Sequence, residues 1–538
     1  WLLYQRNCKY HIHRRSAYIG RGYSMSIVKV PAVGQYGVNR DLSAHELPVN
    51  AWTNALNIRF VDGMASQVLG YKELYPSASV VPYHLLPVDV AGIRTWIYAG
   101  EAKMYTVTNG NVHTNITRQT TGVDVDYTAV RNSWTSSVLG GIPILNNGFD
   151  APQMWALTGK ATALTNWPAS TTAASMRSYK NSLIALNITK TGTNYPYMVK
   201  WSHAADAGTV PVTWDVTDAS KDAGEYDLSE GYDTIVDGLP LRDSFIIYKQ
   251  SSIWRMDYTG GVFVYRFQKI ISNQGALARN CAAEVNGQHF VFSNSDCIIH
   301  DGQTASSVLD KQTRRDLFLQ INSSKADQCF VFVNRMFNEV FACFPSLGSE
   351  TCDRALVWNY IDKTVSFRDL PNINHAETGP VDDSENTTWD TDSGTWDDDA
   401  TPWNSTSASL NRTLSLMASE DQKLFLLDST YTNDGAAITS VLERKGLSLG
   451  EPEAMKLIRG VRPRIYGDNG YVNVQVGYGN TPYEEPTYNT AVPFYVNSTV
   501  AVDSFVTGRY MAIKFTNGTA TNWRLDSYDV DVQKSGMW

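Results

Sequence analysis

The sequence predicts an all-β protein in which a β-propeller-like repeat domain is joined to a β-sandwich or platform domain built from the N- and C-terminal parts of the chain. The first observation is composition: the 538 residues include 29 Tyr and 15 Trp, and only 18% are charged. This balance favours strands over helices. The second is that short apolar segments with period-two alternation recur along the chain. The third is their nearly constant spacing, which is typical of a propeller.

Residues 239–258 are the clearest of these segments. An apolar run of strand length is followed by the polar turn 249–252 and by a second strand. In this second strand Trp254 and Met256 fall on one face, while Arg255 falls on the other. The pattern predicts an antiparallel hairpin that is buried on one side.

The predicted blades begin near six positions, which are spaced by 39, 45, 64, 45 and 41 residues. The longest interval contains the polar stretch 202–237, which we interpret as an insertion. A β-sandwich also uses short strands at intervals, but the near-constant period favours a propeller. The six positions are Thr95, Trp134, Tyr179, Asp243, Gln288 and Cys329.

Changes in composition and pattern divide the chain into segments. Residues 1–24 contain several Lys and Arg but no Asp or Glu, and residues 369–411 contain no Lys or Arg. Two interpretations of residues 1–24 stay open: a basic N-terminal arm, or an extension translated from upstream of the true start. The predicted segments are this arm or extension (1–24), an N-terminal β segment of the platform (25–90), the propeller-like domain (91–375), an acidic Trp/Asp loop (376–410), strands that close the last blade (411–435) and a C-terminal β-sandwich (436–538).

The acidic loop contains a short repeat in which three Trp stand seven residues apart. A coiled coil would need two apolar positions per heptad and helix-forming residues between them, whereas the residues here are Asp, Thr, Ser and Gly. Two interpretations stay open: a solvated loop whose Trp side chains pack locally on the propeller, or a loop that acts as a gate or as a docking site for another protein. Its candidate residues are Trp389, Asp390, Asp392, Trp396, Asp397, Asp398, Asp399 and Trp403.

The sequence carries no motif of a known catalytic class. It has no Walker A loop, no GxGxxG after a strand, no GxSxG elbow and no HExxH. His289 and His300 flank the strands of one predicted blade, and we expect them in the core or at an edge rather than as a catalytic pair. We therefore predict a protein that is not an enzyme, with no catalytic residue, no metal ligand and no cofactor.

Charge and cysteine content exclude further classes. The net charge of −9 argues against general binding to a nucleic-acid backbone, which needs clustered Lys and Arg. No segment has 18 consecutive apolar residues, so we predict no stable membrane insertion. The six cysteines form no CxxC pair, which favours a reduced protein made inside a cell.

Several segments occur in an order that is similar to one known family. They read MSIVKVPAVGQYGVNRDLSAHELPVNAWTNALNIRFVDG near the start, YKNSLIALNI, VDGLPLRDSFIIYKQSSIWRM, GQHFVFSNSDCIIHDGQT and RALVWNY in the middle, and LERKGLSLG, RGVRPRIYG and GRYMAIKF towards the end. From about residue 25 to residue 538 the chain resembles tail nozzle proteins (tail tubular protein B type) of short-tailed bacteriophages. The specificity of the resemblance lies in the order of these segments, because none of them is a catalytic motif.

The resemblance implies a structural protein of the virion tail that is assembled in the cytoplasm of the host bacterium. It implies a homo-hexameric ring at the distal end of the tail, docked below a tail adaptor ring and near the tail fibres or spikes. Such a ring would act as a conduit and gate for genome ejection, with transient passage of double-stranded DNA. The alternative is a propeller-based protein that binds or cleaves carbohydrate during host recognition, with exposed Trp and Asp as its binding groups.

Overall fold

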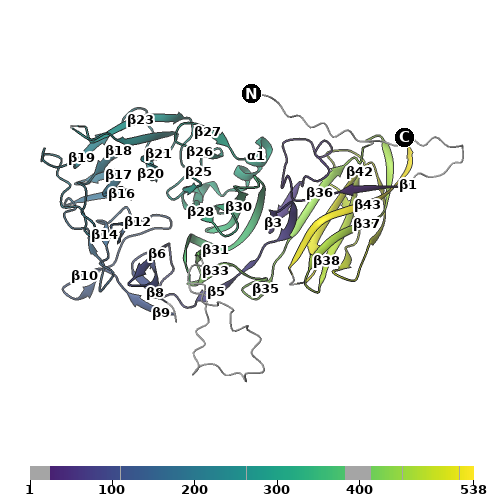
Figure 1. Cartoon of the computed structure of the whole chain (residues 1–538), viewed down its shortest axis with the longest axis horizontal. Helices are drawn as coiled ribbons and strands as arrows, with labels where there is room; N and C mark the ends of the chain where they lie inside the picture. Colours follow the sequence, from purple (N-terminus) through teal and green to yellow (C-terminus); the bar gives the residue numbers. More distant parts are fainter. Residues whose placement is uncertain are drawn as a thin grey trace, which may run out of the picture.

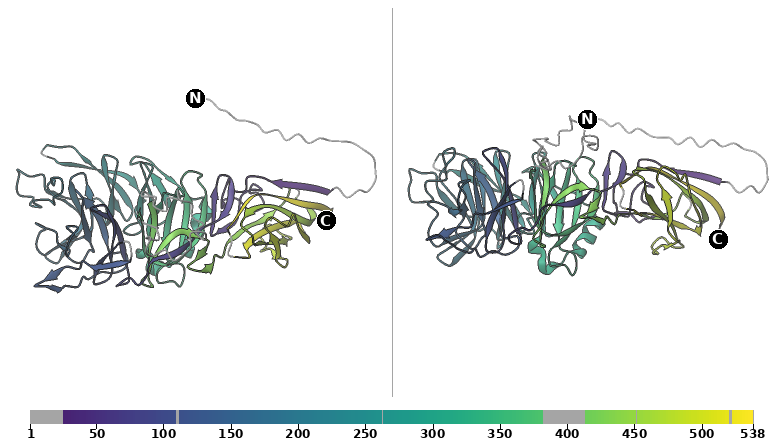
Figure 2. Two further views of the ribbon diagram at one scale, coloured as in Figure 1. Left: turned by 60° about the horizontal axis from the view of Figure 1, so that its bottom comes forward. Right: turned by 90° about the horizontal axis from the view of Figure 1, so that it is seen from below.

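The structure is a computed structural model that describes residues 25–108, 111–261, 263–381, 413–450, 452–519 and 522–537. Nearly all of its regular elements are strands, which confirms the prediction of an all-β protein. The described part contains one α-helix, α1 (Lys311–Gln320), and one 3-10 helix, η1 (Ser323–Gln328). Figures 1 and 2 show a ring of small sheets that lies beside a β-sandwich, and the first and last strands of the chain lie together in the sandwich.

Five consecutive four-stranded antiparallel sheets form the first five blades of the ring. Each is a local meander in which a strand pairs with the next strand along the chain. The blades are β6 (His84–Val90), β7 (Ile93–Ala99), β8 (Met104–Thr108) and β9 (Val112–Asn115); β12 (Thr135–Leu139), β13 (Ile142–Asn146), β14 (Gln153–Met154) and β15 (Thr162–Ala163); β16 (Thr171–Tyr179), β17 (Ser182–Lys190), β18 (Thr193–Trp201) and β19 (Gly224–Asp227); β20 (Ile235–Leu241), β21 (Ser244–Lys249), β22 (Ser252–Tyr258) and β23 (Tyr265–Ser272); and β24 (Ala282–Val285), β25 (Gln288–Phe292), β26 (Cys297–His300) and β27 (Ala305–Ser307). A two-stranded hairpin, β10 (Gln119–Thr120) and β11 (Val123–Asp124), follows the first blade.

One long strand, β31 (Val365–Pro380), belongs to the last two blades. Its first half pairs with β30 of the sixth blade and its second half pairs with β32 of the seventh, with register shifts near Ile373 on both sides. The sixth blade also contains β28 (Phe330–Asn334), β29 (Glu339–Phe344) and β30 (Cys352–Asn359), and the seventh contains β32 (Thr413–Ser419), β33 (Leu424–Thr430) and, as its outer strand, β5 (Gly70–Tyr75). The short β34 (Thr432–Asn433) and β35 (Ala436–Ala437) continue the edge beyond β5.

The ring closes where the seventh blade meets the first. The amide of Leu85 in β6 donates to Nδ1 of His375 in β31 at 3.3 Å, and the Trp96 indole donates to the Pro380 carbonyl at 3.2 Å. A Cβ on Gly379 would lie 2.5 Å from Pro87, so only glycine permits this close approach of the two strands. The outer strand β5 comes from near the start of the chain, and therefore the N-terminal part completes the last blade.

Three predicted boundaries differ from the structure. Both β5 and β6 belong to the propeller, although residues 25–90 were assigned to the platform, and β31 extends to Pro380, inside the predicted acidic loop. In addition, the predicted insertion 202–237 contains β19, the fourth strand of the third blade. These elements are short or polar, and β5 pairs with β33 across about 350 residues of sequence, so local pattern does not assign them.

Most of the predicted blade starts mark the second strand of a blade rather than the first. Thr95 and Gln288 lie in β7 and β25, and Asp243 directly precedes β21. Apart from the apolar β28 of the sixth blade, the first strands surround the axis of the ring and carry polar residues, whereas the second strands are apolar. The apolar signal in the sequence therefore finds the second strand first.

The predicted hairpin within residues 239–258 is present as β21 and β22, but it is buried on both faces. Phe245 and Ile247 pack with Leu186 and other residues of the third blade, while Ile246 and Tyr248 pack with residues of the fifth. Each of these buried side chains contributes about 1.5–3 kcal/mol. The correction follows from blade stacking, because an interior blade has a neighbour on each side.

The platform is a sandwich of two sheets made from both ends of the chain, as predicted. Its first sheet contains β1 (Met25–Val30), β3 (Ile58–Val61), β4 (Met64–Gln67), β43 (Trp523–Met537), β37 (Ala454–Gly467) and β41 (Val502–Gly508), and its second contains β2 (Asn54–Leu56), β36 (Val441–Leu447), β42 (Tyr510–Asn517), β38 (Tyr471–Gly479), β39 (Thr487–Tyr488) and β40 (Val492–Tyr495). The core between the sheets includes Trp52, Phe515 and Tyr528, whose rings contact one another.

The short strand β2 connects the two domains. It pairs in antiparallel register with β36 of the platform and makes a parallel pair, Leu56 with Phe367, to β31 of the sixth blade. The second platform sheet is therefore continuous with the sheet of the last two blades.

Candidate functional site at the propeller axis and the platform junction

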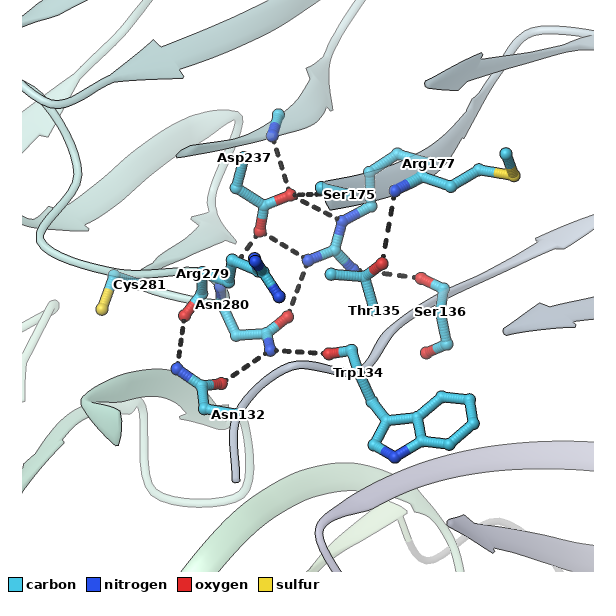
Figure 3. A network of polar contacts seen from close by, with 12 residues as sticks. Asn132, Trp134, Thr135, Ser136, Ser175, Arg177, Asp237, Arg279, Asn280 and Cys281 are labelled. Atoms are coloured by element: carbon cyan, nitrogen blue, oxygen red, sulfur yellow. Dashed lines mark hydrogen bonds and ion pairs between the residues drawn. The ribbon is translucent and has the colours of Figure 1, made fainter. Parts of the chain in front are cut away.

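The first candidate site is a set of hydrogen-bonded side chains at the axis of the ring, which we call the axis network: Asn132, Arg177, Asp237 and Asn280 (Figure 3). Arg177 lies on β16 and Asp237 on β20, and both are buried. Arg177 Nη2 donates to Asp237 Oδ2 at 2.6 Å and Nε donates to Oδ1 at 3.1 Å. Ser175 Oγ and the backbone N–H of Asn280 also donate to this carboxylate, at 2.5 and 3.0 Å.

These contacts keep Asp237 charged. Burial by itself raises the pKa of Asp237, but the positive charge of Arg177 and the hydrogen bonds from Arg177, Ser175 and Asn280 together hold that pKa below its ordinary value. Both carboxylate oxygens are bonded within the protein. The arrangement therefore holds blades together and leaves no oxygen of this carboxylate for a substrate.

The two asparagines carry the axis network across the ring. Arg177 Nη2 donates to Asn280 Oδ1 at 2.7 Å, and Asn280 Nδ2 donates to Asn132 Oδ1 at 2.9 Å. Asn132 Nδ2 in turn donates to the carbonyls of Arg279 and Cys329, at 3.0 and 2.9 Å. These bonds link the second blade with the fifth and sixth, on the other side of the ring, so side chains occupy the axis at this level.

Two buried histidines lie beside the axis network. The rings of His84 and His375 are 4.2 Å apart between centroids. Ser136 Oγ is 2.8 Å from His84 Nε2, and the His375 ring stacks on Phe330. Burial lowers the pKa of His375 to about 3, helped by the positive charge of Arg177, and burial also lowers the pKa of His84 well below its ordinary value. Both rings are therefore neutral at pH 7.

The second candidate site is a buried group of charges between the domains, which we call the junction cluster: Arg59, Glu339, Arg368 and Asp428. Arg59 lies on β3 of the platform, whereas Glu339 on β29 belongs to the sixth blade and Asp428 on β33 belongs to the seventh. Arg59 makes a bidentate pair with Glu339 at 2.6 and 2.8 Å, and its Nη2 also donates to Asp428 at 2.9 Å. Arg368 Nη1 donates to the other oxygen of Asp428 at 2.9 Å.

The junction cluster is buried and tightly connected. All four residues are at most 7% exposed. Burial alone lowers the pKa of Arg59, but the charges of Asp428 and Glu339 and their hydrogen bonds raise it above its ordinary value, so the guanidinium stays charged. The guanidinium also lies 3.6 Å above the centre of the Phe337 ring. One platform side chain therefore anchors two blades at once.

A polar cleft of about 510 Å³ lies beside the junction, between α1 and the platform, and its lining includes Glu443, Lys445 and Glu485. Arg40 crosses it and donates to Asp316 of α1 at 2.9 Å. Both partners are partly exposed, so this ion pair is weaker than those of the junction cluster. It is a second contact between the domains, at their surface.

The residues predicted for a gate or docking loop all lie within 382–412, outside the described residues. The predicted core position of His289 and His300 is confirmed: both are buried, and both contact the Tyr248 hydroxyl, at 2.6 and 2.9 Å. Burial lowers the pKa of His289 to about 3, with the charge of His300 acting in the same direction, and lowers that of His300 to about 4. The cysteines that the structure describes are free and buried.

The sequence interpretation did not identify the residues of either site. Arg59, Arg177 and Asp237 each stand inside a strand, next to apolar or small residues. A charged residue in such a position is a signal for a buried ion pair, although its partner cannot be read locally. In the described part of the chain no group of three or more His, Cys, Asp or Glu is placed to hold a metal ion. No helix among those residues has the length and apolar character needed to cross a membrane.

No family model matches the sequence, and no curated protein matches it. Among solved structures, the chain is similar to a fungal alcohol oxidase of the AA5 family in complex with copper, with a TM-score of 0.40 and 9% identity over 85% of this chain and 93% of that one. It is also similar to BBS1N in complex with ARL6DN (TM-score 0.39, 9% identity, 68% and 99% of the two chains). A third similarity is to apo AztD from Citrobacter koseri (TM-score 0.31, 10% identity, 54% and 86%). Similarities this weak carry no argument about function.

Proposed function

We propose that this chain is the structural tail nozzle of a short-tailed phage, which assembles as a homo-hexameric ring at the distal end of the tail and conducts double-stranded DNA during genome ejection. The observation that supports the proposal most is the junction cluster. A conduit that carries pressurised DNA needs subunits whose domains do not move apart, and buried ion pairs resist separation because breaking one leaves an uncompensated charge. Arg59 joins the platform to two blades in this way.

The axis network bears on the route that DNA would take through the proposed ring. Side chains of opposite blades meet at the axis of the propeller, so a duplex would not pass through a single subunit. It would pass through the lumen that the subunits of a ring enclose. The net charge of −9 suits such a lumen, because a duplex gains no counterion-release free energy from acidic walls and is not held by them.

The proposal places the chain in the virion, below the tail adaptor ring and beside the tail fibres or spikes, with no enzymatic activity of its own. Among the tryptophans that the structure describes, all are buried except the partly buried Trp167. The carbohydrate-binding alternative depends on open Trp faces, and these residues do not supply them. Its other candidate groups are the Trp residues of the 382–412 segment.

The proposal is tested by mixing the full chain with purified adaptor ring and imaging the product, together with light scattering of each component. The expected result is a sixfold ring bound to the adaptor, with a mass for the nozzle part of about 359 kDa, six times the 59.8 kDa chain. Phage particles without the chain should lack the distal tail and regain it when the chain is supplied. A threefold or twelvefold ring, or a monomer that binds glycans on an array, would overturn the proposal.

A further inference from the structure

The first platform sheet ends in two strands whose outer edges are unpaired among the described residues. At one side β41 pairs only with β37, and at the other side β1 pairs only with β43. Figure 1 shows β1 along the rim of the platform. Exposed strand edges present unsatisfied N–H and C=O groups and readily pair with another chain.

Both edges carry large exposed apolar side chains. Phe505 on β41 is 76% exposed, and Ile27 on β1 is 51% exposed. On the same face of each strand, two residues away, stands one exposed charged residue: Asp503 on β41 and Lys29 on β1. Neither charge has an ion-pair partner within the part of the chain that the structure describes. Monomeric proteins usually protect such edges, so we expect the edges of β1 and β41 to bind another chain.

The strand directions fit a second copy of the same chain. Each step from β1 to β43, from β43 to β37 and from β37 to β41 is antiparallel. The two edge strands therefore run in opposite directions. In a closed ring all subunits point the same way along the axis, so β41 of one subunit would meet β1 of the next in antiparallel orientation.

One register pairs the exposed apolar residues of the two edges with each other and their charged residues with each other. When Phe505 stands opposite Ile27 of the partner subunit, Asp503 stands opposite Lys29 of the partner subunit. An apolar pair and an ion pair then form side by side on one face. A shift of one residue would turn every side chain to the wrong face. A shift of two would place Phe505 beside Lys29 of the partner subunit, or Asp503 beside Ile27 of the partner subunit.

We propose that successive subunits join by pairing β41 of one copy with β1 of the next, which makes the first platform sheets continuous around the ring. The inference rests on the proposed ring and adds its subunit contact. Val28 of β1, which is only partly buried, would be covered by the inward face of β41 in this contact. This interface is heterologous, because it joins two different surfaces of the same chain. Subunits that associate through such interfaces form closed rings or open filaments.

The register also sets the geometry of the ring. Within one subunit Asp503 is level with Ile27, through Gly460 and Asp531. Pairing Asp503 with Lys29 of the partner subunit therefore displaces the next subunit by two residues, about 7 Å, over four strand spacings of about 19 Å. This offset corresponds to strands tilted by about 20° from the ring axis, less than in most closed barrels.

A cysteine cross-link tests the contact in the full chain. Ile27→Cys and Phe505→Cys are combined in a chain that also carries Cys8→Ser, and assembled rings are oxidised and separated without reductant. The expected result is a ladder of covalent multimers that ends at six subunits, because opposed strand residues lie within disulfide reach. The control pair is Ile27→Cys with Tyr466→Cys, since Tyr466 is 58% exposed and lies on the part of β37 beyond its pairing with β41, away from the proposed contact. It should give no ladder.

Charge reversal provides a second readout. Asp503→Lys or Lys29→Asp alone should raise the concentration needed for assembly about fivefold, and the two together should restore it. Rings that form normally, without a ladder and without an effect of either reversal, would overturn this contact and leave the proposed nozzle intact. A ladder on assemblies that are not sixfold would support the contact and overturn the nozzle. Chains that stay monomeric with and without adaptor would overturn both.

Discussion

The axis network and the junction cluster use the same chemistry in two different places. Arg177 and Asp237 form a buried pair that holds blades of one domain around an axis. Arg59 forms a buried pair with Glu339, and another with Asp428, that holds one domain against the other. A buried ion pair adds little net stability when it forms but is costly to break. The comparison indicates that this protein places buried charges where independent units meet, which fixes their geometry.

The two sites differ in charge balance. The junction cluster contains two Arg and two carboxylates, whereas the axis network is accompanied by the partly buried Arg279 and by two neutral histidines. Burial lowers the pKa of Arg279, and the charge of Asp237 only partly offsets this effect. The axis, with its neutral histidines, is therefore the more sensitive of the two sites to acid.

The largest effect is expected from Asp428→Asn. This change leaves Arg59 and Arg368 without a shared carboxylate in a buried site, at a cost of about 3–5 kcal/mol in the free energy of unfolding. Urea unfolding followed by near-UV circular dichroism should then show separate transitions for propeller and platform. The matched control is Asp206→Asn, at an exposed position, which should leave the curve unchanged. A single unshifted transition in Asp428→Asn would contradict a locking role for the cluster.

Asp237→Asn should act on the propeller alone. Among the described residues it removes the only carboxylate that Arg177 contacts, and we expect the propeller to lose about 3 kcal/mol while the two domains stay docked. Limited proteolysis should show faster cleavage within the blades and an unchanged rate near β2. The loss in free energy of unfolding in the double variant Asp237→Asn with Asp428→Asn should equal the sum of the two single effects. A departure of more than about 0.5 kcal/mol would mean that the two sites are coupled, which would contradict their independent roles.

The sequence predicts the blades of the propeller better than it predicts the contacts between distant segments. The blades are local meanders, so alternation and spacing were sufficient to predict the propeller and the hairpin within 239–258. The contacts that join the domains and close the platform are non-local. Arg59 and its partner Glu339 are 280 residues apart, and β1 pairs with β43 from the opposite end of the chain. Periodicity places Arg59 in a strand but gives no partner. The resemblance to nozzle proteins concerns the order of segments and likewise does not reveal these pairs.

Acid should weaken the propeller. The pKa values of His289 and His375 are lowered to about 3 and that of His300 to about 4, in each case first by burial. Below about pH 6.5 the unfolded chain binds protons at these histidines and the folded chain does not. The free energy of unfolding therefore falls with decreasing pH, by about 1.4 kcal/mol per unit for each such histidine.

The variant that isolates one of these histidines is His300→Gln. Its unfolding free energy, measured by urea titration between pH 7 and about pH 4, should fall less steeply than that of the unmodified chain, by about one proton. The amide can still donate to or accept from the Tyr248 hydroxyl, so the fold is retained at pH 7. An unchanged slope would mean that His300 is already protonated in the folded chain.

The smallest effect is expected from Phe337→Leu at the junction. The Arg59 guanidinium lies 3.6 Å above the centre of this ring, and loss of the aromatic face in a desolvated site costs about 1–2 kcal/mol. Leucine keeps most of the apolar volume, so the ion pairs with Glu339 and Asp428 stay in place and a single unfolding transition is retained. The neighbouring Met336→Leu, at a position 47% exposed, is the matched control and should be neutral. Equal effects of the two substitutions would show that the aromatic ring adds no stability at the junction, and the charge cluster would then account for the whole strength of the junction.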